Sequence, residues 1–233
     1  MRLSAAIMAH PVRKDSAERV QAALDRDVEI IYDTVAKPSK DPRQRWANGK
    51  RAWEAHDPSA DYHLVIQDDA IVCEDLLAGL EEALDVLGPE GLVSAYTGTG
   101  RPDQYNVRRG LRHAGDKGHS WMPTKSLCWG VAIIAPTSTI GDMLKWCSHS
   151  SKTRMNYDMR VGRYYRDVLG WRTWYTVPSL VNHADGPSLV GHDGTRRVAH
   201  QFHTGSALDV DWTRTPPQGL EIRHTPSRRA RAA

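Results

Sequence analysis

The sequence predicts an α/β domain with a mostly parallel central sheet flanked by helices. Short apolar runs alternate along the first hundred residues with segments whose apolar side chains recur at helical spacing, and this order is typical of parallel strands joined by helices. The 233 residues, 40% hydrophobic and 25% charged, suit one large soluble domain. We expect this domain to span residues 1–205 and a basic, partly disordered extension to cover 206–233.

The expected elements follow one another closely. Strands are predicted at 3–9, 28–32, 62–66 and 92–96, and helices at 14–25, 42–56 and 76–87. Residues 98–126 are rich in Gly, Pro, Arg and His and show no period, so we expect irregular chain there. Beyond them we expect a strand at 127–135, helices at 138–147 and 157–169, a strand at 173–177, and loop-like chain from about 185.

Composition limits the classes of protein to consider. No stretch approaches the roughly 18 to 20 apolar residues that cross a bilayer, and the first residues lack the apolar core and cleavage site of a signal peptide. Cys73, Cys128 and Cys147 are too far apart for a disulfide framework or a zinc spacing. We therefore expect a cytoplasmic protein with reduced thiols and no membrane span, and the sequence leaves its oligomeric state open.

The strongest chemical signal is a pair of acids at the end of a predicted strand. Asp68 and Asp69 directly follow the apolar run of 62–66 and Gln67, at the end of a parallel strand that faces the ligand crevice. Adjacent acids repel unless a cation lies between them, and a divalent metal that bridges them to a diphosphate would supply it. Acids at strand ends are also common turn formers and helix caps, so both interpretations stay open.

A candidate third ligand lies late in the chain. His183 ends the run Val177-Pro-Ser-Leu-Val-Asn-His and precedes a loop rich in Gly and Pro. An imidazole beside two carboxylates would suit Mn²⁺ more than Mg²⁺. A single histidine is more often a polar residue with an ordinary partner, and His192 is an alternative ligand.

The order of several short motifs resembles the glycosyltransferases of the Rossmann-like A-type fold (GT-A), in particular small phage and actinobacterial members. Ile7–Pro11 resembles the first strand and nucleotide-binding loop, and Ile66–Ala70 the acidic metal motif, although Gln67 stands where an acid is usual. Val177–His183 resembles the later strand whose histidine completes the metal site.

Two further motifs extend the likeness over residues 3–190. Cys128–Ile134 resembles the strand that lines the sugar pocket, and Asn156–Asp158 the acidic motif that opens the next helix. The resemblance implies a metal-dependent hexosyltransferase that uses Mn²⁺ or Mg²⁺. It would move a sugar from a nucleoside diphosphate sugar, with a UDP-sugar as the expected donor, to an acceptor hydroxyl.

The resemblance also implies roles for individual residues. Asp69 and His183 would bind the metal, and Asp68 would bind it through water or contact the donor ribose. Asp158 would be the general base of an inverting transfer, with a helix N-cap and a retaining transfer as alternatives. The other residues of the donor pocket would be Ala9, His10, Pro11, Arg13, Asp33, Arg45 and Lys50. A solvated helix face is the alternative for Arg45 and Lys50.

A basic segment, 101–125, indicates the acceptor. Aromatic and histidine side chains are interleaved there with six cations, Arg101, Arg108, Arg109, Arg112, Lys117 and Lys125. Cations with interleaved aromatic side chains suit a polyanion, and some phage-encoded enzymes of the resembled class glycosylate hydroxymethylated pyrimidines in DNA. A base in phage DNA is therefore one acceptor hypothesis, a protein or cell-envelope glycan is another, and a solvated loop is the structural alternative.

Two other functional classes compete with glycosyl transfer. A nucleic-acid-binding protein without catalysis would explain the basic segment, but it leaves the acids and His183 without a role and no helix-turn-helix or zinc-finger signature is present. A sugar-1-phosphate nucleotidyltransferase would also use a metal. The segment after the first strand, His10–Arg13, is not the Gly-rich phosphate loop that usually opens such enzymes.

Overall fold

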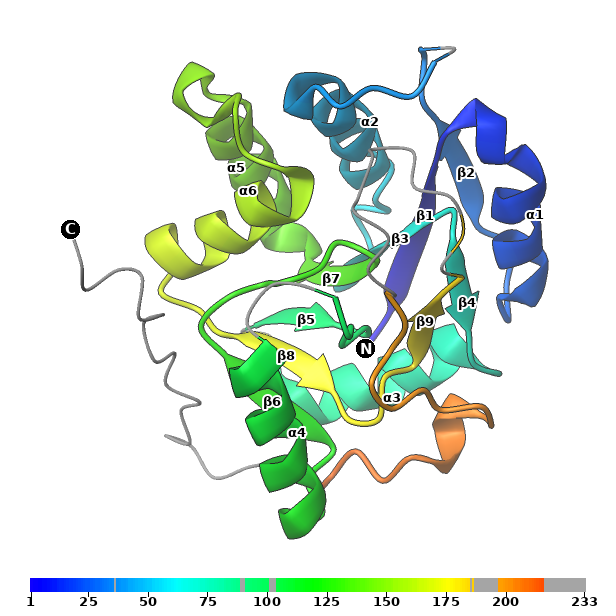
Figure 1. Cartoon of the computed structure of the whole chain (residues 1–233), viewed down its shortest axis with the longest axis vertical. Helices are drawn as coiled ribbons and strands as arrows, with labels where there is room; N and C mark the ends of the chain where they lie inside the picture. Colours follow the sequence, from blue (N-terminus) through cyan, green and yellow to red (C-terminus); the bar gives the residue numbers. More distant parts are fainter. Residues whose placement is uncertain (36, 89–90, 101–103, 185, 187–196, 216–233) are drawn as a thin grey trace.

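A computed structural model describes residues 1–35, 37–88, 91–100, 104–184, 186 and 197–215. A seven-stranded sheet forms its centre (Figure 1). In spatial order the strands are β2 (Glu29–Tyr32), β1 (Leu3–Ala9), β3 (Tyr62–Gln67), β7 (Ala132–Pro136), β5 (Leu92–Ser94), β8 (Thr173–Thr176) and β6 (Trp121–Thr124). Only β7 and β6 run against the other five. The predicted α/β class with a mostly parallel sheet is confirmed.

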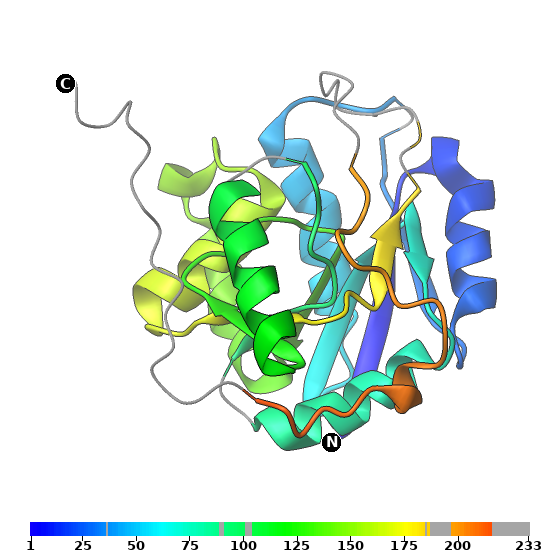
Figure 2. The same cartoon turned by 60° about the horizontal axis from the view of Figure 1, so that its bottom comes forward.

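Helices cover both faces of this sheet (Figures 1 and 2). They are α1 (Lys14–Ala23), α2 (Pro42–Glu54), α3 (Leu76–Leu87), α4 (Gln104–Lys117), α5 (Thr137–Ser148) and α6 (Tyr157–Arg163). Successive side chains of a strand point to opposite faces, and β3 shows the result. Leu64 and Ile66 pack in the core that includes α1, α3 and α4, whereas Val65 packs in the core that includes α2, α5 and α6.

A second, two-stranded sheet lies beside the main one. Its strands are β4 (Ala70–Val72) and β9 (Val181–His183), which pair antiparallel with Ala70 opposite His183. The chain enters β4 directly from the acids that follow β3. The small sheet therefore connects the end of a central strand to a segment more than a hundred residues later.

The expectation of irregular chain at 98–126 is wrong, because α4 and β6 both lie in it. The sequence did not predict this helix because its buried face is narrow and only partly apolar. Val107, Leu111 and Ala114 share that face with Asn106 and Gly110. Glycine is a poor helix former and asparagine is polar, so the apolar period is diluted. The intrinsic helix propensity of this segment is low, and packing against β6 stabilises the helix.

Two other elements begin or end at residues that differ from those expected. The strand expected at 127–135 begins at Ala132, and the helix expected at 157–169 is α-helical only through Arg163 and continues as a π-helix over Tyr164–Val168. Within the residues described, no helix has both the length and the apolarity needed to span a membrane.

Residues 206–215 pack on the domain. Ala207 is fully buried against Gly79 of α3, and Trp212 lies on Trp121 of β6 with ring centroids 5.3 Å apart. Trp121 Nε1 also donates a hydrogen bond to the carbonyl oxygen of Trp212 at 3.2 Å. The rest of the predicted extension, 216–233, lies outside the described residues, as do Arg101 and His192.

Candidate active site

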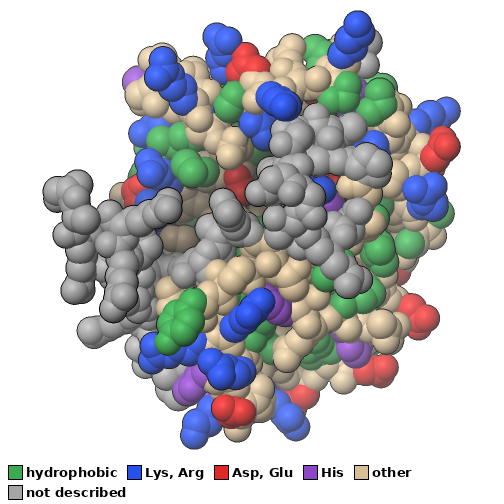
Figure 3. Space-filling model, viewed as in Figure 1, with side chains coloured by type: hydrophobic (Ala, Val, Ile, Leu, Met, Phe, Trp, Pro, Cys, Tyr) green, Lys and Arg blue, Asp and Glu red, His purple; other side chains and the backbone are tan. Residues whose placement is uncertain are grey.

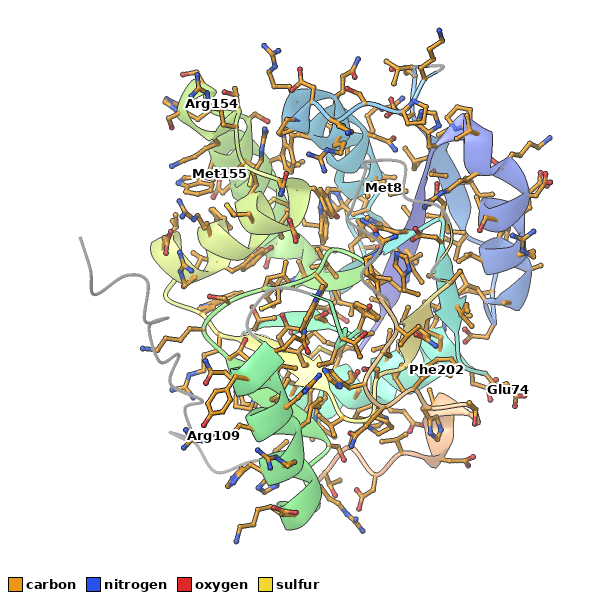
Figure 4. All side chains as sticks on the ribbon, viewed as in Figure 1. Met8, Glu74, Arg109, Arg154, Met155 and Phe202 are labelled. Atoms are coloured by element: carbon orange, nitrogen blue, oxygen red, sulfur yellow. The ribbon has the colours of Figure 1, made fainter. Side chains whose placement is uncertain are left out.

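The site begins where β1 and β3 end side by side. Their parallel register sets Met8 opposite Gln67, so the residues that follow each strand meet at one edge of the sheet. Figure 4 labels Met8 at this end of β1. Asp68 Oδ2 accepts a hydrogen bond from the backbone N–H of His10 at 2.8 Å, and the N–H of Asp68 donates to the carbonyl oxygen of Met8 at 3.2 Å.

The β4–β9 pairing brings His183 to the same place. The N–H of Ala184 donates to the carbonyl oxygen of Asp69 at 2.9 Å, and His183 Nε2 lies 3.2 Å from Asp69 Oδ2. The side chains of both residues are buried, with 4% and 11% exposed. The acids and the histidine expected to converge on a metal are therefore neighbours, although more than a hundred residues separate them in the sequence.

Arg13 is the cation that contacts both acids in the structure. Its Nη1 lies 3.1 Å from Asp68 Oδ1 and forms a second, shorter ion pair with Asp69 Oδ2. A one-turn 3₁₀ helix, Pro11–Arg13, sets the direction of this side chain. His10 caps that turn, with its Nδ1 accepting from the N–H of Val12 at 3.2 Å.

The two acids have opposite pKa shifts. Burial and the adjacent charge of Asp69 raise the pKa of Asp68, and the N–H of His10 and the guanidinium of Arg13 offset this only in part. Burial would also raise the pKa of Asp69, but the hydrogen bond and charge of His183, together with Arg13, lower it to about 2. Asp69 is thus the strongly ionised member of the pair, and Asp68 is the one that takes up a proton more readily.

The side chains at this edge carry the kinds of atoms that bind a divalent cation. Asp69 Oδ1 and His10 Nε2 are buried without a hydrogen-bond partner among the described residues, and a buried polar atom without a partner is costly. Carboxylate oxygens and imidazole nitrogens are ligands that Mn²⁺ accepts. Within the described ranges, no three His, Cys, Asp or Glu side chains form a group that could hold a metal ion. Arg13 lies against both acids at this edge.

A cleft of about 880 Å³ opens from this edge, within the range of small-molecule sites. It is lined by nine of the eleven predicted site residues, Ala9, His10, Arg13, Asp33, Arg45, Asp68, Asp69, Asp158 and His183.

Pro11 and Lys50 do not line the cleft. Pro11 begins the 3₁₀ turn and is exposed. Asn48 of α2 does line the cleft and donates through Nδ2 to the carbonyl oxygen of Ala9 at 2.9 Å. Lys50 comes two residues later, which is more than half a helical turn, and it pairs instead with Glu54 at 3.3 Å on the outer face. Lys50 therefore lies on the helix face that the sequence left open as its alternative place.

The start of α6 also lines the cleft. The N-cap is Asn156, whose Oδ1 accepts from Arg45 Nη2 at 3.0 Å, and Asp158 is the second helical residue. Asp158 is therefore not the N-cap. Its Oδ1 accepts from the N–H of Met159 at 2.8 Å. Burial raises the pKa of this carboxyl, and backbone N–H groups, including that of Met159, together with Arg45 offset the rise only in part.

Sequence reasoning missed several residues of the cleft. Tyr96, after β5, lies edge-on to Trp129 with ring centroids 5.9 Å apart and 6.5 Å from the ring of His183. Trp129 belongs to the motif that indicated a sugar pocket, so its aromatic side chain was the available signal. Arg163, the last residue of α6, and Arg166, in the π-helix, also line the cleft. The change from α-helix to π-helix alters the direction of side chains, so regular helical spacing did not predict their place.

The described part of the basic segment, residues 104–125, does not line this cleft. Arg108, Arg109 and Arg112 are exposed on α4, and Tyr105 is 69% exposed beside them. Lys and Arg side chains gather over α4 in the lower part of Figure 3, and Figure 4 labels Arg109 on the outer side of this helix. No described residue of 104–125 lines the cleft.

Comparisons with known proteins add little to this picture. No protein-family model matches the chain, and no similar sequence is found among curated proteins. One solved structure with a similar arrangement is a mannose-1-phosphate geranyltransferase from Thermus thermophilus, 11% identical over 76% of this chain and 74% of that one, with a TM-score of 0.37. A likeness this weak indicates nothing about function, so the function of this protein has to be inferred from the geometry of its cleft.

Proposed function

We propose that this protein is a metal-dependent glycosyltransferase that takes a sugar from a nucleoside diphosphate sugar, with a UDP-sugar as the expected donor. One observation carries the proposal: Asp68, Asp69 and His183 converge at the carboxyl edge of a mostly parallel sheet, in a cleft that Asp158 also lines. Ligands of open α/β sheets bind at this edge, and a diphosphate with its cation matches the donor atoms present there.

The donor would lie along the ends of β1 and β3. Asp69 and His183 would hold Mn²⁺ or Mg²⁺, and the bound metal would neutralise charge on the departing diphosphate. Ala9 and Asp33 lie on the β1–β2 side of the cleft, where the N–H of Asp33 donates to the carbonyl oxygen of Ala9 at 2.8 Å. This side suits the nucleoside, because Asp33 offers a carboxylate to hydroxyl or amide hydrogens of the ribose or base.

Asp158 would act as the general base. The acceptor oxygen forms its bond to the anomeric carbon while the bond from that carbon to the diphosphate oxygen breaks, and the acceptor proton passes to the Asp158 carboxylate. A raised pKa favours this role, because a base works best when its pKa approaches the working pH. Transfer by direct displacement inverts the configuration of the sugar.

A hydroxymethylated pyrimidine in DNA is the acceptor that we propose to test first. Arg163 and Arg166 at the cleft rim and the exposed arginines of α4 offer cations for phosphate contacts. Because α4 lies outside the cleft, these contacts would hold the strand while one base enters. A protein or cell-envelope glycan that is modified while DNA is not would refute this acceptor and leave the donor chemistry intact.

A thermal-shift panel of nucleoside diphosphate sugars, with and without Mn²⁺, tests the donor. A specific donor should raise the melting temperature only when metal is present, since a ligand of the native state stabilises it. Asp69→Asn should abolish the metal-dependent shift. Asp116→Asn, an equal change at an exposed acid of α4, is the matched control and should preserve it.

The products then separate the two enzyme classes. Release of a nucleoside diphosphate, by hydrolysis or transfer, supports the proposal. Pyrophosphate released from a nucleoside triphosphate and a sugar 1-phosphate would identify a nucleotidyltransferase instead. A metal-dependent shift that persists unchanged in Asp69→Asn would refute the assignment of the metal site.

A further inference from the structure

The guanidinium of Arg13 lies against both acids of the cleft. Its Nη1 contacts one oxygen of each carboxylate, Asp68 Oδ1 and Asp69 Oδ2. Only 17% of the Arg13 side chain is exposed. A guanidinium stays charged in proteins, so it supplies a fixed positive charge where two adjacent carboxylates would otherwise repel each other.

The ion pair with Arg13 occupies one oxygen of the carboxylate that would bind a metal. Asp69 Oδ2 contacts Arg13 and also lies 3.2 Å from His183 Nε2. A divalent cation held between Asp69 and His183 would lie within a few ångströms of the guanidinium, and like charges at that distance repel strongly in a poorly hydrated site. Arg13 and the cation therefore compete for the same acids.

The backbone of Arg13 is held by the turn that follows β1. The N–H of Arg13 donates to the carbonyl oxygen of His10 at 2.8 Å, and the capped 3₁₀ turn fixes the chain. Arginine has several rotatable bonds, and its guanidinium binds a phosphate as readily as a carboxylate. A diphosphate that arrives with a cation offers the guanidinium a new partner within reach of the same turn.

We propose that Arg13 is an internal counter-ion that keeps a lone divalent cation off Asp68 and Asp69 and turns to the diphosphate when cation and donor bind together. This inference rests on the proposed function and adds that cation and donor bind cooperatively. Cation and diphosphate should each tighten the binding of the other, because coupling between two ligands is reciprocal. Arg13 is then a positioning residue whose effect is visible without turnover.

Mn²⁺ binding, followed by the electron paramagnetic resonance signal of free Mn²⁺, tests the proposal on the full chain. Arg13→Gln removes the internal cation and should bind Mn²⁺ alone about tenfold or more tightly than the wild type. UDP should tighten Mn²⁺ binding in the wild type and have a much smaller effect in the variant. Arg19→Gln, the same change at an exposed arginine of α1, is the matched control and should behave as wild type.

Arg13→Lys provides a second reading if the glutamine variant does not fold. A lysine keeps the charge but contacts only as a point charge, so its affinity for Mn²⁺ alone should lie between those of the wild type and Arg13→Gln. Unchanged or weaker Mn²⁺ binding in the folded variants overturns the proposal. Failure of the proposed function has a different signature: no nucleoside diphosphate sugar gives a metal-dependent shift, while the Mn²⁺ affinities still report on Arg13.

Discussion

The two adjacent acids of the cleft should have opposite effects on stability when each is replaced by its neutral isostere. His183 and Arg13 lower the pKa of Asp69 from 3.8 to about 2. A shift of this size means that the ionised side chain stabilises the native state by about 2 kcal/mol at neutral pH. Asp69→Asn should therefore lower the free energy of unfolding by about 2 kcal/mol. The Asp69 side chain is only 11% exposed, so solvent screens little of this electrostatic stabilisation.

Asp68→Asn should instead raise the free energy of unfolding at pH 7. Burial and the charge of Asp69 raise the pKa of Asp68 above its ordinary value of 3.8. Its ionised form is therefore less favourable in the native state than in the unfolded chain. Asparagine removes that cost and can still accept the hydrogen bond from the N–H of His10.

Urea denaturation at pH 7 and under acidic conditions measures both effects. The contribution of Asp69 is complete above about pH 4 and is lost as the pH falls through about 2, because its native pKa is the lower one. The difference between the wild type and Asp69→Asn should shrink over that window. This account of the site would be refuted if Asp68→Asn and Asp69→Asn lost the same stability at pH 7. It would also be refuted if Asp69→Asn were as stable as the wild type.

Three further predictions concern the fold around the cleft. Burial lowers the pKa of His63 to about 4. The contribution of His63 should therefore lower the free energy of unfolding by about 3 kcal/mol as the pH drops from about 6.5 to about 4, and urea titrations of His63→Gln should lack this contribution. Gly49→Ala would place a methyl group against the ring of Tyr157. It should lower the free energy of unfolding, measured by thermal unfolding, by about 1 to 3 kcal/mol. Trp212→Ala should cost about 3 to 5 kcal/mol, because its side chain is 3% exposed, whereas Leu208→Ala at 43% exposure should change the unfolding midpoint little.

Local patterns in the sequence were enough for most of the fold. Strands buried on both faces appear as continuous apolar runs, and β1 and β3 begin where those runs begin. The helix α3 was equally clear from its leucines. The pattern failed at α4, where Asn106 and Gly110 occupy part of the buried face, because burial there depends on the neighbouring strand and not on the side chains alone.

The sequence by itself determined that Asp68 and Asp69 stand at the edge of the sheet where ligands bind, since the end of an apolar parallel strand predicts that position. Only the tertiary structure decided which distant groups join them. The β4–β9 pairing brings in His183, and the turn after β1 directs Arg13 onto both carboxylates. Spacing along one element orients a side chain on that element, whereas contacts between elements depend on how the whole chain packs, and no local pattern encodes them.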